Sequence, residues 1–182
     1  MMLPEMAKDP YDVYTYQTRL INRQQIDYLK DKVKADMSML DVGGRNPLTE
    51  FMEKEFDVKA DNTSGDLDIS FTAPRDEYDV IIYSHVIEHQ FNPLFTLLEL
   101  KKRMKDTARM YILLPNKPKF LWYTGHYHEI DRHRMGLLLK RAGLSILSVT
   151  RQRLKKPLKD RIGIRPFIRT FWEFNVIYEI KK

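Results

Sequence analysis

Histidine and acidic side chains concentrate in two short stretches of this 182-residue sequence. The first stretch covers residues 84–89, and the second covers residues 126–133. Histidine titrates near neutral pH, so a histidine in either stretch could accept a proton from a reacting hydroxyl or amine. The second stretch also carries the hydrogen-bonding side chains that an acceptor site needs. We predict three of these histidines as catalytic candidates: His128, His126 and His89.

A zinc site is the alternative interpretation of the second stretch, with His126, His128 and His133 as ligands. Closed zinc sites generally need four ligands fixed by secondary structure, and the chain has no cysteine to supply a thiolate. We therefore expect no metal site. The absence of cysteine also excludes disulfide bonds and cysteine nucleophiles.

A glycine turn flanked by acidic residues forms a second candidate site. Residues 37–42 form an apolar run typical of a buried strand, and Gly43-Gly44 follows. Asn46-Pro47 then predicts a helix start, since asparagine caps helices and proline suits their first position. Glycines let a ligand approach the backbone, and a helix N-terminus offers free N–H groups. We predict that Asp61 ends the second strand, where its carboxylate could hold both ribose hydroxyls of a nucleoside-containing ligand.

The two common nucleotide-binding loops are absent from this turn. The dinucleotide fingerprint G-x-G-x-x-G would need glycine at positions that Arg45 and Leu48 occupy. The phosphate-binding pattern G-x-x-x-x-G-K-[ST] does not occur either.

Strands and helices alternate along the chain, which predicts a parallel sheet with helices on both faces. Ligands of such sheets bind beyond the carboxyl ends of the strands. Only 16 residues separate the second and third expected strands, so we expect an abbreviated sheet edge there. The expected strands are 37–42, 57–61, 78–84, 109–115, 144–149 and 174–180, and expected helices include 12–34 and those beginning after Asn46, Asn92 and Asp131.

Composition predicts one globular domain, since 43% of the residues are apolar and 31% are charged. No apolar stretch approaches the ~18 residues of a membrane span, so we expect a soluble, cytoplasmic protein. The net charge is +6, and residues 151–182 carry ten basic and three acidic side chains. This basic segment indicates either an anionic partner, such as nucleic acid, phosphate or a lipid surface, or merely a solvated face.

Residues 36–150 resemble the class I S-adenosylmethionine-dependent methyltransferases of the small-molecule-type branch. The run from Leu40 to Gly43 is similar to the first motif of that family. Residues 78–89, followed by Asn92-Pro93, are similar to the run on the family's fourth strand and form the most specific match. One difference lies in the first motif, where Arg45 and Pro47 replace later glycines.

The resemblance implies a Rossmann-like α/β fold, with a mostly parallel seven-stranded sheet whose last strand is antiparallel. It implies an enzyme that transfers a methyl group from S-adenosylmethionine to a small or anionic acceptor and releases S-adenosylhomocysteine. The alternative is a methyltransferase-like module without catalysis, which binds RNA or another anionic partner through the basic segment. The cofactor contacts that the resemblance and the glycine turn together predict are Asp41, Gly43, Gly44, Arg45, Asp61, Asp66, Leu67, Ser84 and His85.

The domain organisation that we expect is a single unit spanning residues 1–182. Residues 1–35 would form a helical cover, residues 36–150 the cofactor-binding core, and residues 151–182 the basic segment with the last strand.

Overall fold

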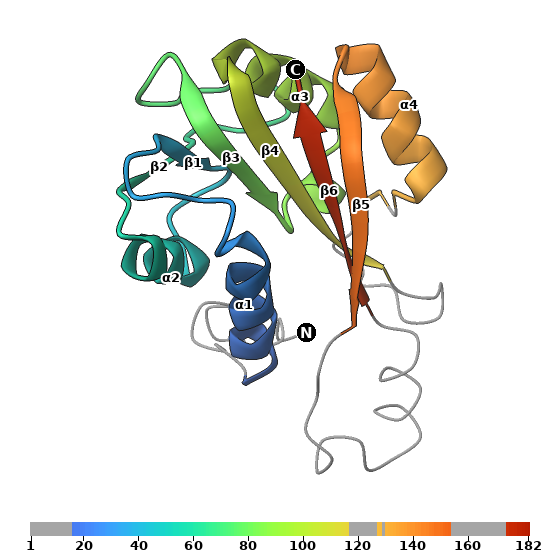
Figure 1. The fold of residues 1–182 in the computed structure, drawn as a ribbon. Helices are drawn as coiled ribbons and strands as arrows, with labels where there is room; N and C mark the ends of the chain where they lie inside the picture. The colour runs from blue at the N-terminus through green and yellow to red at the C-terminus, as the bar shows by residue number, and fades with distance from the viewer. Residues whose placement is uncertain (1–15, 117–126, 129, 154–173) are drawn as a thin grey trace, which may run out of the picture.

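A six-stranded mixed sheet with helices on both faces makes up the computed structural model, which describes residues 16–116, 127–128, 130–153 and 174–182 (Figure 1). The strands are β1 (Met39–Asp41), β2 (Ala60–Asn62), β3 (Tyr78–Ser84), β4 (Met104–Asn116), β5 (Ser145–Arg153) and β6 (Phe174–Lys181). The helices are α1 (Tyr16–Leu29), α2 (Pro47–Phe56), the 3-10 helix η1 (Ile87–His89), α3 (Pro93–Arg103) and α4 (Arg132–Ala142).

The strand order is β2-β1-β3-β4-β6-β5. Paired strands are parallel except where β6 is involved, because β6 runs antiparallel to both of its neighbours. The carboxyl ends of β1 to β5 consequently lie at one edge, which is the lower edge in Figure 1. We call this side of the molecule the carboxyl edge.

The expected count of seven strands is not confirmed, because the described residues form six. Residues 63–77, which connect β2 to β3, are all described and contain neither a helix nor a strand of the sheet. A single bridge between Ser64 and Thr72 closes a compact loop in this connection. The connection is too short for a helix and a further strand, so the sheet ends at β2.

Alternating side chains of the central strands bury the two faces of the sheet. Val80 and Ile82 pack with α1 and α2, whereas Ile81 and Tyr83 pack with α3 and α4. This alternation is the period of a strand that is covered on both sides. It accounts for the continuous apolar run of β3.

Helix ends follow the capping residues of the sequence. The Asn46 side chain accepts hydrogen bonds from two backbone N–H groups of α2, and the Asn92 side chain accepts one, from Phe95 of α3. Asp131 caps α4, which ends where Gly143 adopts a left-handed φ of 69°. None of the described helices is long and apolar enough to span a membrane.

Candidate active site

The glycine turn after β1 is held by its neighbours and leaves one side open. Gly43 adopts a φ of 111°, a region that favours glycine, and its N–H donates to Thr63 Oγ1 at 2.7 Å. A Cβ atom added at Gly44 would meet no atom within 4 Å. A ligand could therefore approach the backbone at Gly44.

Asn62 fastens β2 to this turn, although the sequence analysis did not select it. Its Nδ2 donates to the carbonyl oxygens of Asp41 at 3.1 Å and Gly43 at 3.2 Å. The signal that could have identified Asn62 is its position, because polar side chains at the end of one strand reach the turn that follows the next.

Asp41 is buried at the end of β1, directly before the glycine turn. Its carboxylate is 1% exposed and accepts hydrogen bonds from Thr49 Oγ1 at 2.5 Å and Asn46 Nδ2 at 3.4 Å. Burial raises the pKa of Asp41 to about 6, against the effect of these donors. The sequence predicted a cofactor contact here, and the structure places the Asp41 carboxylate against side chains at the start of α2.

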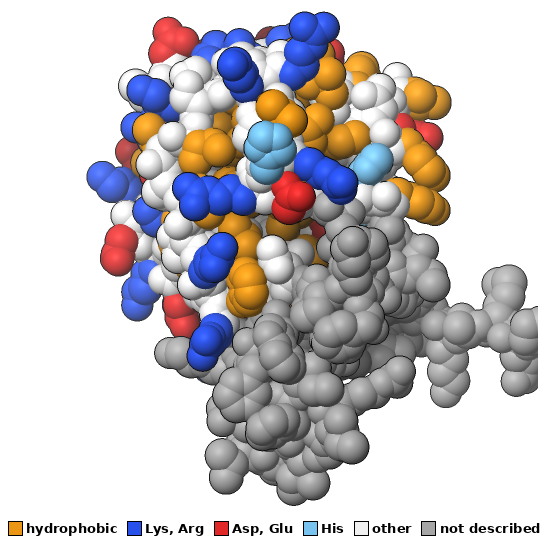
Figure 2. Space-filling view, turned by 90° about the vertical axis from the view of Figure 1, so that its right-hand side faces the viewer, with side chains coloured by type: hydrophobic (Ala, Val, Ile, Leu, Met, Phe, Trp, Pro, Cys, Tyr) orange, Lys and Arg blue, Asp and Glu red, His pale blue; other side chains and the backbone are white. Residues whose placement is uncertain are grey.

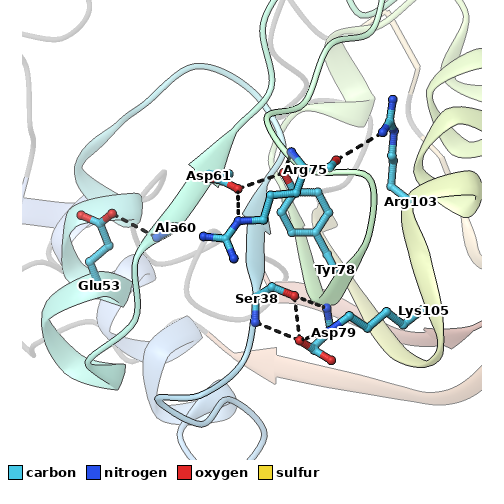
Figure 3. Close-up of polar contacts among 9 residues, drawn as sticks. All are labelled: Ser38, Glu53, Ala60, Asp61, Arg75, Tyr78, Asp79, Arg103 and Lys105. Atoms are coloured by element: carbon cyan, nitrogen blue, oxygen red, sulfur yellow. Dashed lines mark hydrogen bonds and ion pairs between the residues drawn. The ribbon is translucent and has the colours of Figure 1, made fainter.

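Asp61 is the middle residue of β2, so the prediction that it ends the strand is wrong, and Asn62 ends it instead. The Asp61 carboxylate already has partners, as Figure 3 shows: Arg75 Nε lies 2.9 Å from Oδ2, and the Tyr78 hydroxyl donates to the same oxygen at 3.0 Å. Both contacts use Oδ2, so neither involves Oδ1.

Arg45 is directed at α2. Its guanidinium forms a two-point ion pair with Glu53, at 2.5 Å and 3.2 Å. Glu53 Oε1 also accepts the N–H of Ala60, as Figure 3 shows. The pair removes the long cation from the open side of Gly44. A cofactor contact of Arg45 would have to compete with this pair.

The loop that carries Asp66 and Leu67 is fixed against the start of α3. Leu67 presents its carbonyl oxygen to Gln90 Nε2 at 3.1 Å and to Thr96 Oγ1 at 2.6 Å. The Asp66 side chain accepts the N–H of Asp68 at 3.1 Å within the same loop. These hydrogen bonds hold the loop beside the carboxyl edge.

The end of β3 contains strained backbone and polar side chains. His85 adopts a φ of 54°, which is uncommon for a residue other than glycine. Its Nδ1 lies 3.4 Å from Oε1 of Glu88, which is buried. Ser84 donates to Gln25 of α1 at 3.1 Å, so α1 closes this part of the edge.

The described part of the second histidine stretch lies against η1. The N–H groups of Tyr127 and His128 donate to the carbonyl oxygen of Glu88 at 2.9 Å and 3.2 Å. The Tyr127 ring stacks on Phe91, with ring centroids 4.1 Å apart. His126 lies outside the described residues, and His89 is exposed at the end of η1.

His128 lines a cavity of about 490 Å³ between α3 and α4. Its Nε2 lies 3.4 Å from the carbonyl oxygen of Phe91. None of the predicted cofactor contacts lines this cavity, so the structure does not bring His128 together with them there. Figure 2 shows the side of the molecule that carries α4, on which apolar side chains lie among lysines and arginines.

Among the described residues, no three histidine or acidic side chains are grouped closely enough to hold a metal ion. His133 lines a different surface hollow from His128.

Several buried polar side-chain atoms without a hydrogen-bond partner lie at the carboxyl edge. In the described part of the chain, every buried side-chain oxygen or nitrogen without a hydrogen-bond partner belongs to α1, to the segment after β3, to the end of β5 or to the start of β6. These atoms are Gln24 Oε1, Gln25 Nε2, His85 Nε2, Glu88 Oε1 and Oε2, Gln152 Oε1 and Asn175 Nδ2. Because buried polar atoms are normally paired, this edge is where a polar ligand is expected.

The sequence profile of the methyltransferase domain matches residues 2–149 of this chain. The chain belongs to the methyltransferase domain family. This match confirms the resemblance drawn from the first motif and from the run on β3. No curated protein matches the sequence significantly.

Solved structures of methyltransferases share the fold at low sequence identity. An S-adenosylmethionine-dependent methyltransferase from Archaeoglobus fulgidus is 16% identical, with a TM-score of 0.57 over 94% of this chain and 100% of the other. Coclaurine N-methyltransferase, solved with N-methylheliamine and S-adenosylhomocysteine, is 10% identical, with a TM-score of 0.64 over 87% and 72%. A complex of the Haloferax volcanii Trm112 activator with a methyltransferase gives 13% identity and a TM-score of 0.62 over 94% and 97%.

Proposed function

We propose that this methyltransferase-family protein transfers a methyl group from S-adenosylmethionine to a small or moderately sized acceptor. The observation that carries the proposal is the collection of unpaired buried polar atoms at the carboxyl edge. Open α/β sheets bind their ligands at this edge, where the connection order reverses. When bound, the cofactor supplies a methyl group on a sulfonium sulfur, and the protein has to align the acceptor with it.

The residues at the glycine turn fit such a cofactor. The backbone at Gly44 is open, and the Asn46-capped N-terminus of α2 is directly adjacent to it. Since Arg45 pairs with Glu53, the replacement of a family glycine by arginine leaves this approach free. Asp41 then acts as a support of the turn, with Gly43 held by Thr63.

The other predicted contacts would complete the cofactor site. Asp66 and Leu67 would border the adenine, Ser84 and the backbone of His85 would form a wall, and Asp61 would hold the ribose through Oδ1. Their supporting hydrogen bonds fix this frame before any ligand binds. A prearranged frame lowers the ordering cost of binding.

Calorimetry with S-adenosylhomocysteine tests the proposal. We expect the wild-type protein to bind it, and Asp61→Asn to weaken binding by about tenfold or more, because a charged hydrogen-bond acceptor is worth ~1.5–3 kcal/mol. Arg75→Gln is the matched control, since it breaks the same ion pair and leaves the carboxylate. We expect its affinity to remain within threefold of wild type.

Equal losses in the two variants would show that Asp61 acts only through its ion pair. Absence of S-adenosylhomocysteine binding to wild type would contradict the proposed function. Salt-sensitive RNA binding by such a protein would then support the alternative of a binding module with a basic C-terminal segment, of which residues 154–173 lie outside the described part of the chain.

We propose that the segment from His126 to His133 recognises the acceptor, with His128 as the first candidate and His126 and His89 as further catalytic candidates. Its hydrogen bonds to the Glu88 carbonyl oxygen support this, because residues 127–128 lie beside η1, which follows β3 at the carboxyl edge. We expect His128→Ala to lower turnover while affinity for S-adenosylhomocysteine stays within threefold. His133→Ala is the control, and equal loss of turnover in both variants would contradict the assignment.

A further inference from the structure

The cavity between α3 and α4 has a largely apolar lining. Its volume of about 490 Å³ is that of a small-molecule site. The apolar side chains that line it are Phe91, Pro93, Leu94, Ile130, Leu137 and Leu138. Two of them remain open to solvent, since Phe91 is 67% exposed and Leu137 is 55% exposed. Large apolar side chains that stay exposed around a hollow with a polar rim are typical of a ligand-binding surface.

One face of α4 supplies a continuous side of this cavity. Arg134, Leu137, Leu138 and Arg141 all line it. Residues with this spacing lie on the same face of a helix, so the two leucines lie between the two arginines. A ligand that packs against the leucines therefore comes within reach of a guanidinium group.

The charge around the cavity is positive. None of its lining residues is acidic, whereas Arg134 and Arg141 are cationic. Arg134 Nε lies 3.9 Å from Asp131 Oδ2, and within the described part of the chain no acidic side chain forms an ion pair with Arg141. Residues 92–94 line the cavity where α3 begins, and the N-terminal end of a helix favours negative charge. A ligand with an anionic group is therefore complementary to this cavity.

We propose that the cavity between α3 and α4 binds a small molecule that has an apolar body and a carboxylate group. The apolar body packs against Leu137 and Leu138, and Arg141 binds the carboxylate. Arginine suits this role because its planar guanidinium can donate two parallel hydrogen bonds to one carboxylate. The inference goes beyond the proposed function, since it assigns a ligand class to this cavity and requires nothing of the cofactor.

Titration of the protein without cofactor tests this inference, with phenylbutyrate and phenylbutanol as matched probes. The two compounds share the apolar body and differ in the anionic group. We expect phenylbutyrate to bind at least about threefold more tightly, a modest preference because Arg141 is exposed to solvent. Both probes should shift the NMR signals of the His128 ring, which lines the cavity, and leave those of His133, which lines a different hollow.

Acetate is the third probe, because it carries the charge without the apolar body. We expect it to bind at least about tenfold more weakly than phenylbutyrate, since most of the lining is apolar. Equal binding of phenylbutyrate and phenylbutanol, or of phenylbutyrate and acetate, overturns the inference. Absence of phenylbutyrate binding overturns it as well.

Arg141→Gln should remove the preference for the carboxylate. Lys140→Gln is the matched control, because it removes the same charge from the neighbouring position of α4 and Lys140 does not line this cavity. We expect the preference to persist in this control. Equal losses in the two variants would show a general effect of net charge and overturn the inference.

Leu137→Ala tests the apolar part of the site. It should weaken the binding of phenylbutyrate and phenylbutanol alike, by about threefold or more, since it removes apolar contact area. Leu98→Ala is the control, because Leu98 is an exposed residue of α3 that does not line the cavity. Unchanged binding in Leu137→Ala overturns the inference.

Vesicles that contain phosphatidylglycerol test a membrane surface as the other occupant of this cavity. We expect any co-sedimentation of the protein with these vesicles to be the same in wild type and Arg141→Gln. Co-sedimentation that depends on Arg141, without binding of phenylbutyrate, overturns the inference. None of these measurements uses S-adenosylhomocysteine, so failure of this inference and failure of the proposed function are separate results.

Discussion

Asp41 has a carboxyl group that is buried beneath the start of α2 and hydrogen-bonded to Thr49. Its pKa rises from 3.8 to about 6, so folding favours the protonated form. The benefit of the raised pKa is fully present below pH 3.8 and is lost as the pH rises through about 6. By linkage, ionised Asp41 costs the fold about 3 kcal/mol at neutral pH.

Asp41→Asn should therefore change the pH dependence of stability. Asparagine keeps an oxygen for Thr49 and cannot ionise, so the variant should gain about 2 kcal/mol relative to wild type between pH 4.5 and pH 7.5. Urea unfolding at the two pH values measures the difference. Glu50→Gln, an exposed change on α2, is the control, and a stability difference that does not vary with pH would contradict the expectation.

At the level of elements, the glycine turn depends on a neighbouring strand for its shape. Asn62 at the end of β2 donates to two carbonyl oxygens of the turn, and Thr63 accepts the N–H of Gly43. The turn and the first residues of α2 are in this way held to β2 as well as to β1. This explains how a turn with only two glycines keeps one fixed shape.

Asn62→Ala should release the turn. Loss of its donors should lower the free energy of unfolding by about 1–3 kcal/mol and weaken binding of S-adenosylhomocysteine by at least fivefold. Asp131→Ala is the control, because loss of the α4 cap costs a comparable ~0.5–2 kcal/mol far from the turn. Similar loss of ligand affinity in both variants would show that the effect comes from global destabilisation.

At the scale of the whole molecule, two hydrophobic cores hold the sheet between its helices. Leu29 at the end of α1 is completely buried in the core that also contains Met52 of α2 and Ile82 of β3. Polar contacts reinforce α1, since Gln24 exchanges hydrogen bonds with the end of β5. The first helix is therefore part of the fold as well as a cover of the carboxyl edge.

Leu29→Ala should lower the free energy of unfolding by ~2–5 kcal/mol, since it leaves a cavity in this core. Leu137→Ala is the matched control on α4, where the side chain is 55% exposed, and should change stability by less than ~0.5 kcal/mol. Chemical denaturation of the two variants provides the measurement. A small effect of Leu29→Ala would show that α1 is not integral to the domain.

Short-range patterns in the sequence determined much of the secondary structure of this protein. Apolar runs predicted β3 and the strands around it, and the caps at Asn46, Asn92 and Asp131 begin helices where the sequence predicted. These features depend on residues within a few positions of each other, so a single sequence contains them. Membership of the methyltransferase domain family follows from the same local motifs, because the match to the family depends on the order of residues along the chain.

Contacts between distant residues were decided only by the tertiary structure. The pairing of Asp61 with Arg75 and of Asn62 with the glycine turn depends on which side chains the sheet brings together. The pairing of Arg45 with Glu53 depends on how the turn enters α2. The sequence predicted ligand roles for Asp61 and Arg45 because the types of these residues and their positions in the sequence are compatible with such roles. Burial of the Glu88 carboxylate beside His85 depends likewise on packing between segments that are distant in the sequence.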